Sequence, residues 1–194
     1  MKILVVFFIS TCLFSQGLGR NPVRLSHDGI ELSFVAPLAH PRDAELPQPK
    51  PKMEDGIAML GSYELTGGQM PLLEVGVMKI PEQVKDLKGF CLWLSKKLSL
   101  KEGDPKQVGQ FSYEVIANNG TEAGALFVRR GVMDFSGAPV PSLTVMFVKL
   151  QQGRAFLFSI TDLDEHDPMK LLPSLKGVAN QLISSVHIGS VKQP

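Results

Sequence analysis

The second half of this sequence is built from apolar segments that come in pairs, each pair joined by a short polar turn. The pairs are 111–117 with 123–130 and 142–150 with 154–161. The turns contain Asn119-Gly120 and Gln152-Gly153, and asparagine and glycine accept the positive φ angles of hairpin turns. Strands joined in this way run antiparallel. The pattern therefore predicts two consecutive β-hairpins, with residues 134–141 as a loop between them because they include a glycine and two prolines.

Three more strands are predicted in the first half of the chain. Residues 29–36 alternate apolar and polar side chains, which is the period of a half-buried strand. Residues 57–65 and 72–80 are also rich in apolar side chains. The segment between them, 66–71, contains two glycines and a proline, so we expect a hairpin there. Because both faces of 72–80 carry apolar side chains, this strand is expected near the centre of the sheet.

Residues 37–52 are predicted to form an extended surface loop. The segment carries five prolines. Proline has no backbone N–H to donate, so the segment cannot form a helix or a central strand. A docking peptide centred on Pro47 to Pro51 is an alternative, but this stretch is short and has no flanking aromatic residues. We expect an excursion between strands.

Two helices are predicted. The first covers 81–99, with Pro81 at its first position and an apolar stripe at three- and four-residue steps. The stripe consists of Val84, Leu87, Cys91, Leu94 and Leu98. The second helix ends near Val186 and begins at Pro168, with Asp167 as its cap, or at Pro173. In the first case it must kink at Pro173, and in the second a separate turn precedes it.

Together these elements predict an α+β fold. An antiparallel sheet of about six to seven strands would pack against the long helix and the C-terminal helix, in an α/β/α-type sandwich. Without its first 19 residues the chain has about 175, a length typical of one domain with one sizeable core. We therefore expect a single domain over residues 20–194.

Residues 1–19 have the pattern of a secretory signal peptide. Lys2 provides a positive start, an apolar stretch runs to Phe14, and Gly17-Leu18-Gly19 resembles a cleavage site. The stretch is shorter than the roughly 20 apolar residues of a transmembrane helix. We expect the protein to be exported to a periplasm or secreted. Lipid attachment at Cys12 is a less favoured alternative, because a threonine precedes that cysteine and the apolar run continues beyond it.

The cysteine and charge content argue against several classes of protein. Cys91 is the only cysteine after the leader, so no internal disulfide can form and Cys91 is expected to be buried in the core. The chain has 20 Lys and Arg against 19 Asp and Glu, and loss of Lys2 would make the numbers equal. Proteins that bind nucleic acids or membrane surfaces usually carry a basic excess. We therefore expect neither nucleic-acid binding nor strong membrane binding.

Motifs for catalysis, cofactors or metals are absent from the sequence. It has no nucleophile elbow, phosphate-binding loop or dinucleotide fingerprint, and its histidines stand apart from other ligands. The densest polar cluster is 162–167, where Asp162 and Asp164 could chelate calcium or His166 could act as a base. The cluster lacks the glycine and the distal glutamate of a calcium loop. We expect a solvated loop and no catalytic residue, cofactor or metal.

The order of the predicted elements and three segments of the chain resemble the Mog1/PsbP-like family. The segments are Asp28 to Phe34, Phe156 to Thr161 and Leu175 to Val186. The resemblance implies an antiparallel sheet covered by helices, and partner binding in place of catalysis. Exported bacterial proteins of unknown role belong to this family. It carries no invariant motif, so no functional residue is transferred, and the proline-rich stretch 37–51 departs from the more compact family pattern.

Three functional hypotheses follow. The first is an exported, non-enzymatic accessory or protein-interaction module, whose partner is another protein. The second is a carrier of a small apolar ligand or lipid, bound between the sheet and helix 81–99, where Met78, Phe90 and Trp93 could line a pocket. The third is a hydrolase that uses His166, which requires a nucleophile within hydrogen-bonding reach.

Overall fold

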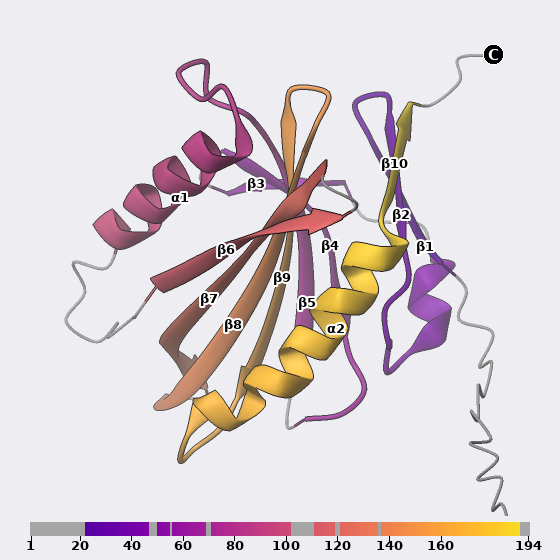
Figure 1. The fold of residues 1–194 in the computed structure, drawn as a ribbon. Coiled ribbons are helices and arrows are strands. Elements are labelled where there is room, and N and C mark those ends of the chain that lie inside the picture. The colour runs from indigo at the N-terminus through magenta and orange to yellow at the C-terminus, as the bar shows by residue number, and fades with distance from the viewer. Residues whose placement is uncertain are drawn as a thin grey trace, which may run out of the picture.

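The computed structural model describes residues 22–46, 50–54, 56–68, 71–101, 111–118, 121–135 and 137–190. Within them, seven strands form one antiparallel sheet in the order β3-β4-β5-β9-β8-β7-β6, and three form a small sheet, β1-β2-β10. The large sheet consists of β3 (Lys52–Glu54), β4 (Ile57–Glu64), β5 (Leu72–Lys79), β6 (Phe111–Asn118), β7 (Thr121–Phe135), β8 (Ala138–Gln151) and β9 (Arg154–Leu163). The small sheet consists of β1 (Val23–His27), β2 (Ile30–Phe34) and β10 (His187–Ser190). The predicted α+β fold is confirmed (Figure 1).

The large sheet has a hydrophobic core on each face. Helix α1 (Leu87–Lys101) covers one face, whereas helix α2 (Leu172–Ser185) and the small sheet cover the other. Successive side chains of a strand point to opposite faces. On β9, Phe156, Phe158 and Ile160 therefore join the larger core beneath α2, while Ala155 and Leu157 join the smaller core beneath α1. The predicted sandwich is confirmed, and the small sheet adds to one of its layers.

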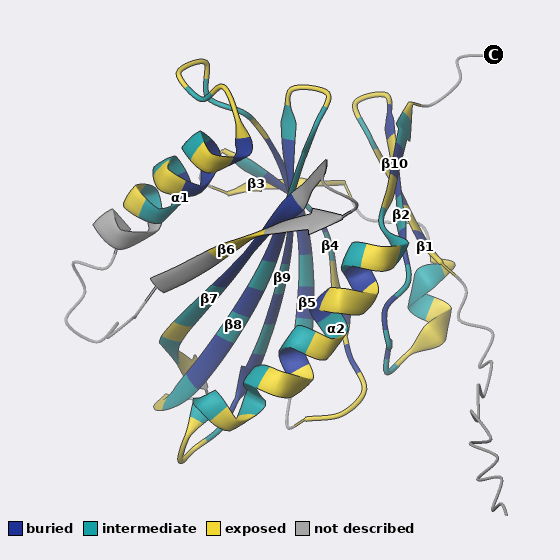
Figure 2. Ribbon diagram, in the orientation of Figure 1, coloured by how far each residue is buried: buried dark blue, intermediate teal, exposed yellow. Residues whose placement is uncertain are grey.

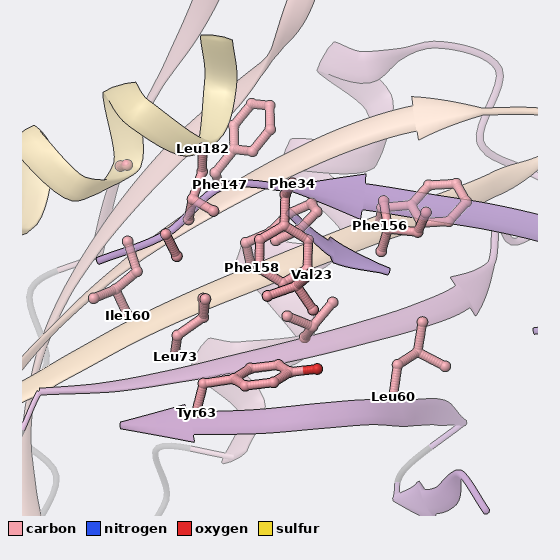
Figure 3. Packing of buried hydrophobic residues seen from close by; sticks show 14 of the residues in the cluster. Val23, Phe34, Leu60, Tyr63, Leu73, Phe147, Phe156, Phe158, Ile160 and Leu182 are labelled. Carbon is pink, nitrogen blue, oxygen red and sulfur yellow. The ribbon is translucent and has the colours of Figure 1, made fainter. Parts of the chain in front are cut away.

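Aromatic rings tie the small sheet to the large one. The Phe34 ring of β2 lies edge-on to the rings of Phe158 (5.5 Å between centroids) and Tyr63 (6.1 Å). Phe147 of β8 stacks on Phe158 at 5.8 Å. Figure 3 shows these rings gathered with Leu182 of α2, and Figure 2 shows the buried residues running along the central strands. Burial of aromatic area is the main source of stability in such a core.

The hairpins predicted from the turn residues are present. β8 and β9 pair in register up to the turn at Gln152-Gly153, where both residues have positive φ angles, 52° and 70°. β4 pairs with β5, and β6 pairs with β7. The predicted turn residues Asn119-Gly120 lie outside the described residues. As expected, β5 is an interior strand, with β4 on one side and β9 on the other.

The prediction of a loop at 134–141 is wrong. β7 and β8 remain paired up to a turn in which Gly137 has a φ of 87° and donates its N–H to Asp134 Oδ1 at 2.8 Å. Pro139 and Pro141 lie within β8. They are tolerated because the paired residues of β8 and β9 end at Ser142, and on that side Pro141 only accepts, through its carbonyl oxygen, the N–H of Asp164 at 3.1 Å. A strand paired on one side only can accommodate a residue without an N–H.

Three short strands are absent from the sequence-based prediction. β1 precedes β2, and the turn between them is formed by Asp28 and Gly29, whose φ angles are 47° and 74°. An Asp-Gly pair flanked by alternating residues is a strong hairpin signal that the prediction did not use. β3 begins at Lys52, the last residue of the predicted proline-rich loop, and β10 pairs with β2 from the opposite end of the chain. A strand such as β10, which pairs with residues far away in the sequence, has little local sequence pattern from which it can be predicted.

The predicted start of the first helix is also wrong. α1 begins at Leu87, because Asp86 Oδ1 accepts a hydrogen bond from the N–H of Gly89 (2.6 Å) and so caps the helix. Pro81 instead accepts the N–H of Val84 in a separate turn. Cys91 belongs to α1 and is fully buried, as predicted.

The second helix follows one of the two predicted alternatives. A 3-10 turn, Pro168–Leu171, comes first, and Asp167 caps it by accepting the N–H of Met169 at 3.1 Å. α2 then begins with Pro173 in its first turn, where the missing N–H has no cost. Within the described residues, no helix has the length and apolar character needed to cross a membrane. The predicted leader and Cys12 lie outside the described residues.

Tyr63 provides a test of the larger core. Its side chain is buried, and among the described residues its hydroxyl has no hydrogen-bond partner. Burial, and secondarily the charge of Asp43, raises the pKa of Tyr63 from 10.0 to about 12. Between pH 10 and 12 the unfolded state therefore loses this proton while the folded state keeps it, so stability falls as the pH rises.

Replacing Tyr63 with phenylalanine is expected to leave the free energy of unfolding at pH 7 unchanged or to raise it by about 1 kcal/mol, because a buried, unpaired hydroxyl is removed. The variant should also lose less stability than the wild type between pH 10 and 12. Urea unfolding of both proteins at pH 7, 9 and 11 measures the two effects. Destabilisation by more than 1 kcal/mol at pH 7 would contradict this account of the hydroxyl.

Candidate functional site

A recess opens where one end of the large sheet meets the turn between β1 and β2. Its volume is about 440 Å³, within the range of about 300–1,000 Å³ typical of small-molecule sites. Strands β4 and β5 contribute buried residues to it, and side chains from β3, β9, α1 and the β1–β2 turn complete its lining. These elements lie far apart in the sequence, so the recess exists only in the folded chain.

The inner part of the recess is apolar. Ala58 and Val77, of the larger core, and Met78, of the smaller core on the opposite face of the sheet, line it and are buried, with relative exposures of 3%, 4% and 8%. Met53, on the edge strand β3, also lines it and is 67% exposed. A flexible, exposed thioether beside a buried apolar surface can adapt to an apolar group that enters. The recess therefore combines buried apolar side chains with an exposed methionine.

Charged side chains line the outer part of the recess. Arg154 Nη1 lies 3.4 Å from Asp28 Oδ2, and His27 Nε2 lies 3.5 Å from the same oxygen. Lys79 and Lys97 are further cations in the lining. Asp28 is more than half exposed, so its ion pairs contribute little to stability. Among the described residues, Lys79, Lys97 and Arg154 therefore bring positive charge to the lining, and Asp28 brings a carboxylate.

The structure places the three predicted pocket residues close together but in different roles. Met78 lines the recess. Phe90 is fully buried in the smaller core, and its ring lies 5.5 Å from that of Trp93, which is half-buried at the margin of this core. Lys97 Nζ lies 5.2 Å from the centroid of the Trp93 ring. Trp93 therefore contributes to the recess indirectly, by a cation–π contact with a lysine of its lining.

Sequence reasoning missed the charged residues of the recess: Asp28, Lys79, Lys97 and Arg154. Arg154 and Asp28 are separated by 126 positions, and no local pattern connects them. The Asp28-Gly29 turn is the one available signal, because recognising it would have placed Asp28 at the tip of a hairpin.

The prediction of a solvated loop at 162–167 is wrong for Asp162, which lies within β9. Asp162 is almost fully buried, and its Oδ1 accepts the N–H of Leu163 at 2.8 Å. Its other oxygen lies so close to Gly68 that a Cβ at that position would collide with it. Asp162 therefore lies beneath the loop between β4 and β5, where a larger residue than glycine has no room.

Asp164 and Asp167 organise the turn before α2. Asp164 Oδ1 accepts the N–H groups of His166 and Asp167, both at 2.8 Å. These bonds, that from Asp167 first, lower the pKa of the Asp164 carboxyl. The imidazole of His166 is exposed, and no described residue places a nucleophile in hydrogen-bonding contact with it. Within the described residues, no group of three or more His, Cys, Asp or Glu side chains is arranged to hold a metal ion.

No protein-family profile and no curated protein sequence matches the chain. Among solved structures, the cyanobacterial PsbP (CyanoP) from Synechocystis sp. PCC 6803 superimposes with a TM-score of 0.53. The match covers 89% of this chain and 96% of CyanoP, at 13% sequence identity. The chain has a PsbP-like fold. The resemblance predicted from the sequence is confirmed at the level of the fold.

A second solved structure gives a weaker match. LpqN, described as involved in cell envelope biogenesis of Mycobacterium tuberculosis, has a TM-score of 0.42 and 14% identity. The match covers 72% of this chain and 82% of LpqN. At these identities a PsbP-like fold says nothing about which residues act, and function must be argued from the site.

Proposed function

We propose that the protein is an exported, non-enzymatic accessory module that binds another protein, with β3 and the adjacent recess as the contact. The observation that carries the proposal is the position of Met53, which is 67% exposed on the edge strand of the large sheet and lines the recess. An edge strand offers unpaired backbone N–H and C=O groups to an extended segment of a partner.

The length and composition of β3 suit a regulated contact. The strand has three residues, all exposed, and Lys52 and Glu54 flank Met53. A short, charged edge resists uncontrolled strand addition by other copies. Met53 then supplies the apolar anchor, and the recess supplies room for a partner side chain beside it.

The leader pattern of residues 1–19 supports the proposal of export. The structural role of the acidic cluster 162–167 supports the proposal that the protein is not an enzyme. Asp164 and Asp167 use their carboxylates to accept backbone N–H groups, which is a structural task. His166 is exposed on the same turn. These positions favour a solvated loop over a catalytic centre.

Site-specific photo-crosslinking in the cells that produce the protein tests the proposal. A photoreactive residue replaces Met53 in one full-length variant and Met133 in the control, which is an exposed methionine on β7. We expect one discrete protein adduct from position 53, none from position 133, and a protein in the exported fraction that lacks residues 1–19. Equal labelling at both positions, or an uncleaved chain in the cytosol, would overturn the proposal.

A carrier of a small apolar ligand is the second candidate function, because buried apolar side chains, Met78 among them, line the recess. Native mass spectrometry after mild purification distinguishes the two. A co-purifying ligand supports the carrier, and bare protein that still forms the position-53 adduct supports the interaction module.

A further inference from the structure

We propose that a small cavity on the face of the large sheet covered by α1 binds a primary alkylammonium ion with a short alkyl chain. The cavity shares no lining residue with the recess described above. Its volume is about 180 Å³, below the range of about 300–1,000 Å³ typical of small-molecule sites, so it suits one short group. The proposal does not depend on either candidate function.

The residues that line the cavity lie on one face of the sheet. Four of them occupy directly paired positions on the neighbouring strands β5, β9, β8 and β7: Glu74, Ser159, Met146 and Phe127. Directly paired residues of antiparallel strands point to the same face. Phe127 belongs to the smaller core and Met146 packs against that core, so this row lies on the face covered by α1.

A second row of lining residues supplies two hydroxyl groups. Thr161, Thr144 and Arg129 are paired across β9, β8 and β7, and each lies two residues from a member of the first row, so they share its face. Thr144 Oγ1 lies 2.8 Å from Thr161 Oγ1, and one of these hydroxyls donates to the other. Arg129 already takes part in another interaction, so it is not counted among the groups that bind the ligand.

Apart from Arg129, the polar side chains of the lining all carry oxygen atoms that accept hydrogen bonds. Glu74 is half-buried, and among the described residues its carboxylate has no hydrogen bond or ion pair. An ionised carboxylate only accepts, and each hydroxyl oxygen has two lone pairs, so Ser159 and the two threonines can also accept. A primary ammonium group has three donors and no acceptor. It therefore matches this lining better than a neutral or anionic group of the same size.

The electrostatic surroundings of Glu74 favour a cation. Burial, and secondarily the negative charge of Glu54 on β3, raises the pKa of the Glu74 carboxyl. Both effects make the ionised carboxylate less stable, and a bound cation offsets both. β8 and β9 contribute only uncharged side chains to the lining, and Arg129 on β7 is the other charged residue in it.

The far end of the first row accommodates a short alkyl chain. Phe127 is buried there, and Met146 is half-buried beside it. A thioether side chain is flexible and adapts its rotamer to an apolar group that enters. The small volume of the cavity limits the length of the chain that fits.

Carbon-13 NMR of the Glu74 carboxyl group in the wild-type protein tests the proposal. The resonance is assigned by its absence from a Glu74→Gln variant. Without ligand, we expect Glu74 to titrate above the ordinary pKa of 4.5. Saturating butylammonium should lower this pKa, because the cation binds the ionised carboxylate in preference to the protonated one. Butan-1-ol, which has the same chain and no charge, should leave the pKa unchanged. A pKa that butylammonium does not lower overturns the proposal.

The affinities of three probes at pH 7 test which part of the cation is recognised. Amide chemical shifts of β5 and β9 follow the binding of butylammonium, butan-1-ol and tetramethylammonium, a cation without N–H donors. We expect butylammonium to bind about tenfold or more tightly than the other two, because it alone makes charge-assisted hydrogen bonds. Its affinity should fall as the pH drops through the pKa of Glu74, while the amine, with a pKa of about 10, stays charged. Equal affinities of the two cations overturn the recognition of N–H donors.

Matched variants locate the binding. Glu74→Gln should weaken butylammonium about tenfold or more and leave butan-1-ol unchanged. Glu31→Gln is the control, because Glu31 is exposed on β2 of the small sheet and the charge change is the same. Ser159→Ala removes one acceptor and should weaken butylammonium about two- to tenfold, whereas Ser26→Ala, at an exposed serine of β1, should not. Equal losses in Glu74→Gln and Glu31→Gln, or no loss in either, overturn the proposed site.

Discussion

Replacing Phe158 with alanine is expected to lower the free energy of unfolding by about 3–5 kcal/mol. The Phe158 side chain is fully buried, and its ring contacts that of Phe34 in the small sheet and that of Phe147 in the large sheet. Its removal leaves a cavity between the two sheets and ends both aromatic contacts. Domains of this size are typically stable by about 5–15 kcal/mol, so much of the native stability would be lost.

Urea unfolding followed by far-UV circular dichroism measures this loss. The control is Leu92→Ala, which truncates an apolar side chain that is 47% exposed on α1 and should change the stability by less than about 0.5 kcal/mol. A loss below about 1 kcal/mol for Phe158→Ala would mean that the small sheet does not depend on this aromatic contact.

Replacing Gly124 with alanine is expected to cost about 3 kcal/mol, the upper end of the range for overpacked sites. Gly124 lies in β7, and a Cβ there would collide with the carbonyl oxygen of Val148 and with the Phe147 ring. The oxygen belongs to the backbone of the neighbouring strand β8. It cannot move aside without separating β7 from β8, so the usual relief through side-chain rotation is not available.

Gly177→Ala is the matched control for this prediction. Gly177 lies in α2, and a Cβ built there meets no atom within 4 Å. Alanine is the better helix former, so this variant should gain about 0.5–1 kcal/mol. Thermal unfolding of both variants gives the comparison. The steric account fails if Gly124→Ala is as stable as the wild type, or if the two substitutions shift the melting temperature in the same direction.

The confirmed secondary-structure predictions have a common physical origin. The hairpin of β8 and β9 was predictable because alternating side chains and the Gln152-Gly153 turn are adjacent in the sequence. The turn before α2 was predictable from the Asp167-Pro168 pair, since capping requires only neighbouring residues. The wrong predictions at 134–141 and at Pro81 both treat proline as the boundary of an element. Proline lacks a backbone N–H, so its effect depends on whether a neighbouring carbonyl would need an N–H at that position.

The sequence by itself determined the period of each main strand, the apolar stripe of α1 with Cys91 buried, and the α+β class, because these depend on interactions between residues close in the chain. Only the tertiary structure decided that β10 joins β2, that Arg154 reaches Asp28, and that Met78 and Lys97 line one recess. The first two contacts join residues that lie far apart in the chain, and the third joins a strand to the helix that follows it. Their energies depend on the packing of the whole fold, and a short stretch of sequence does not contain that information.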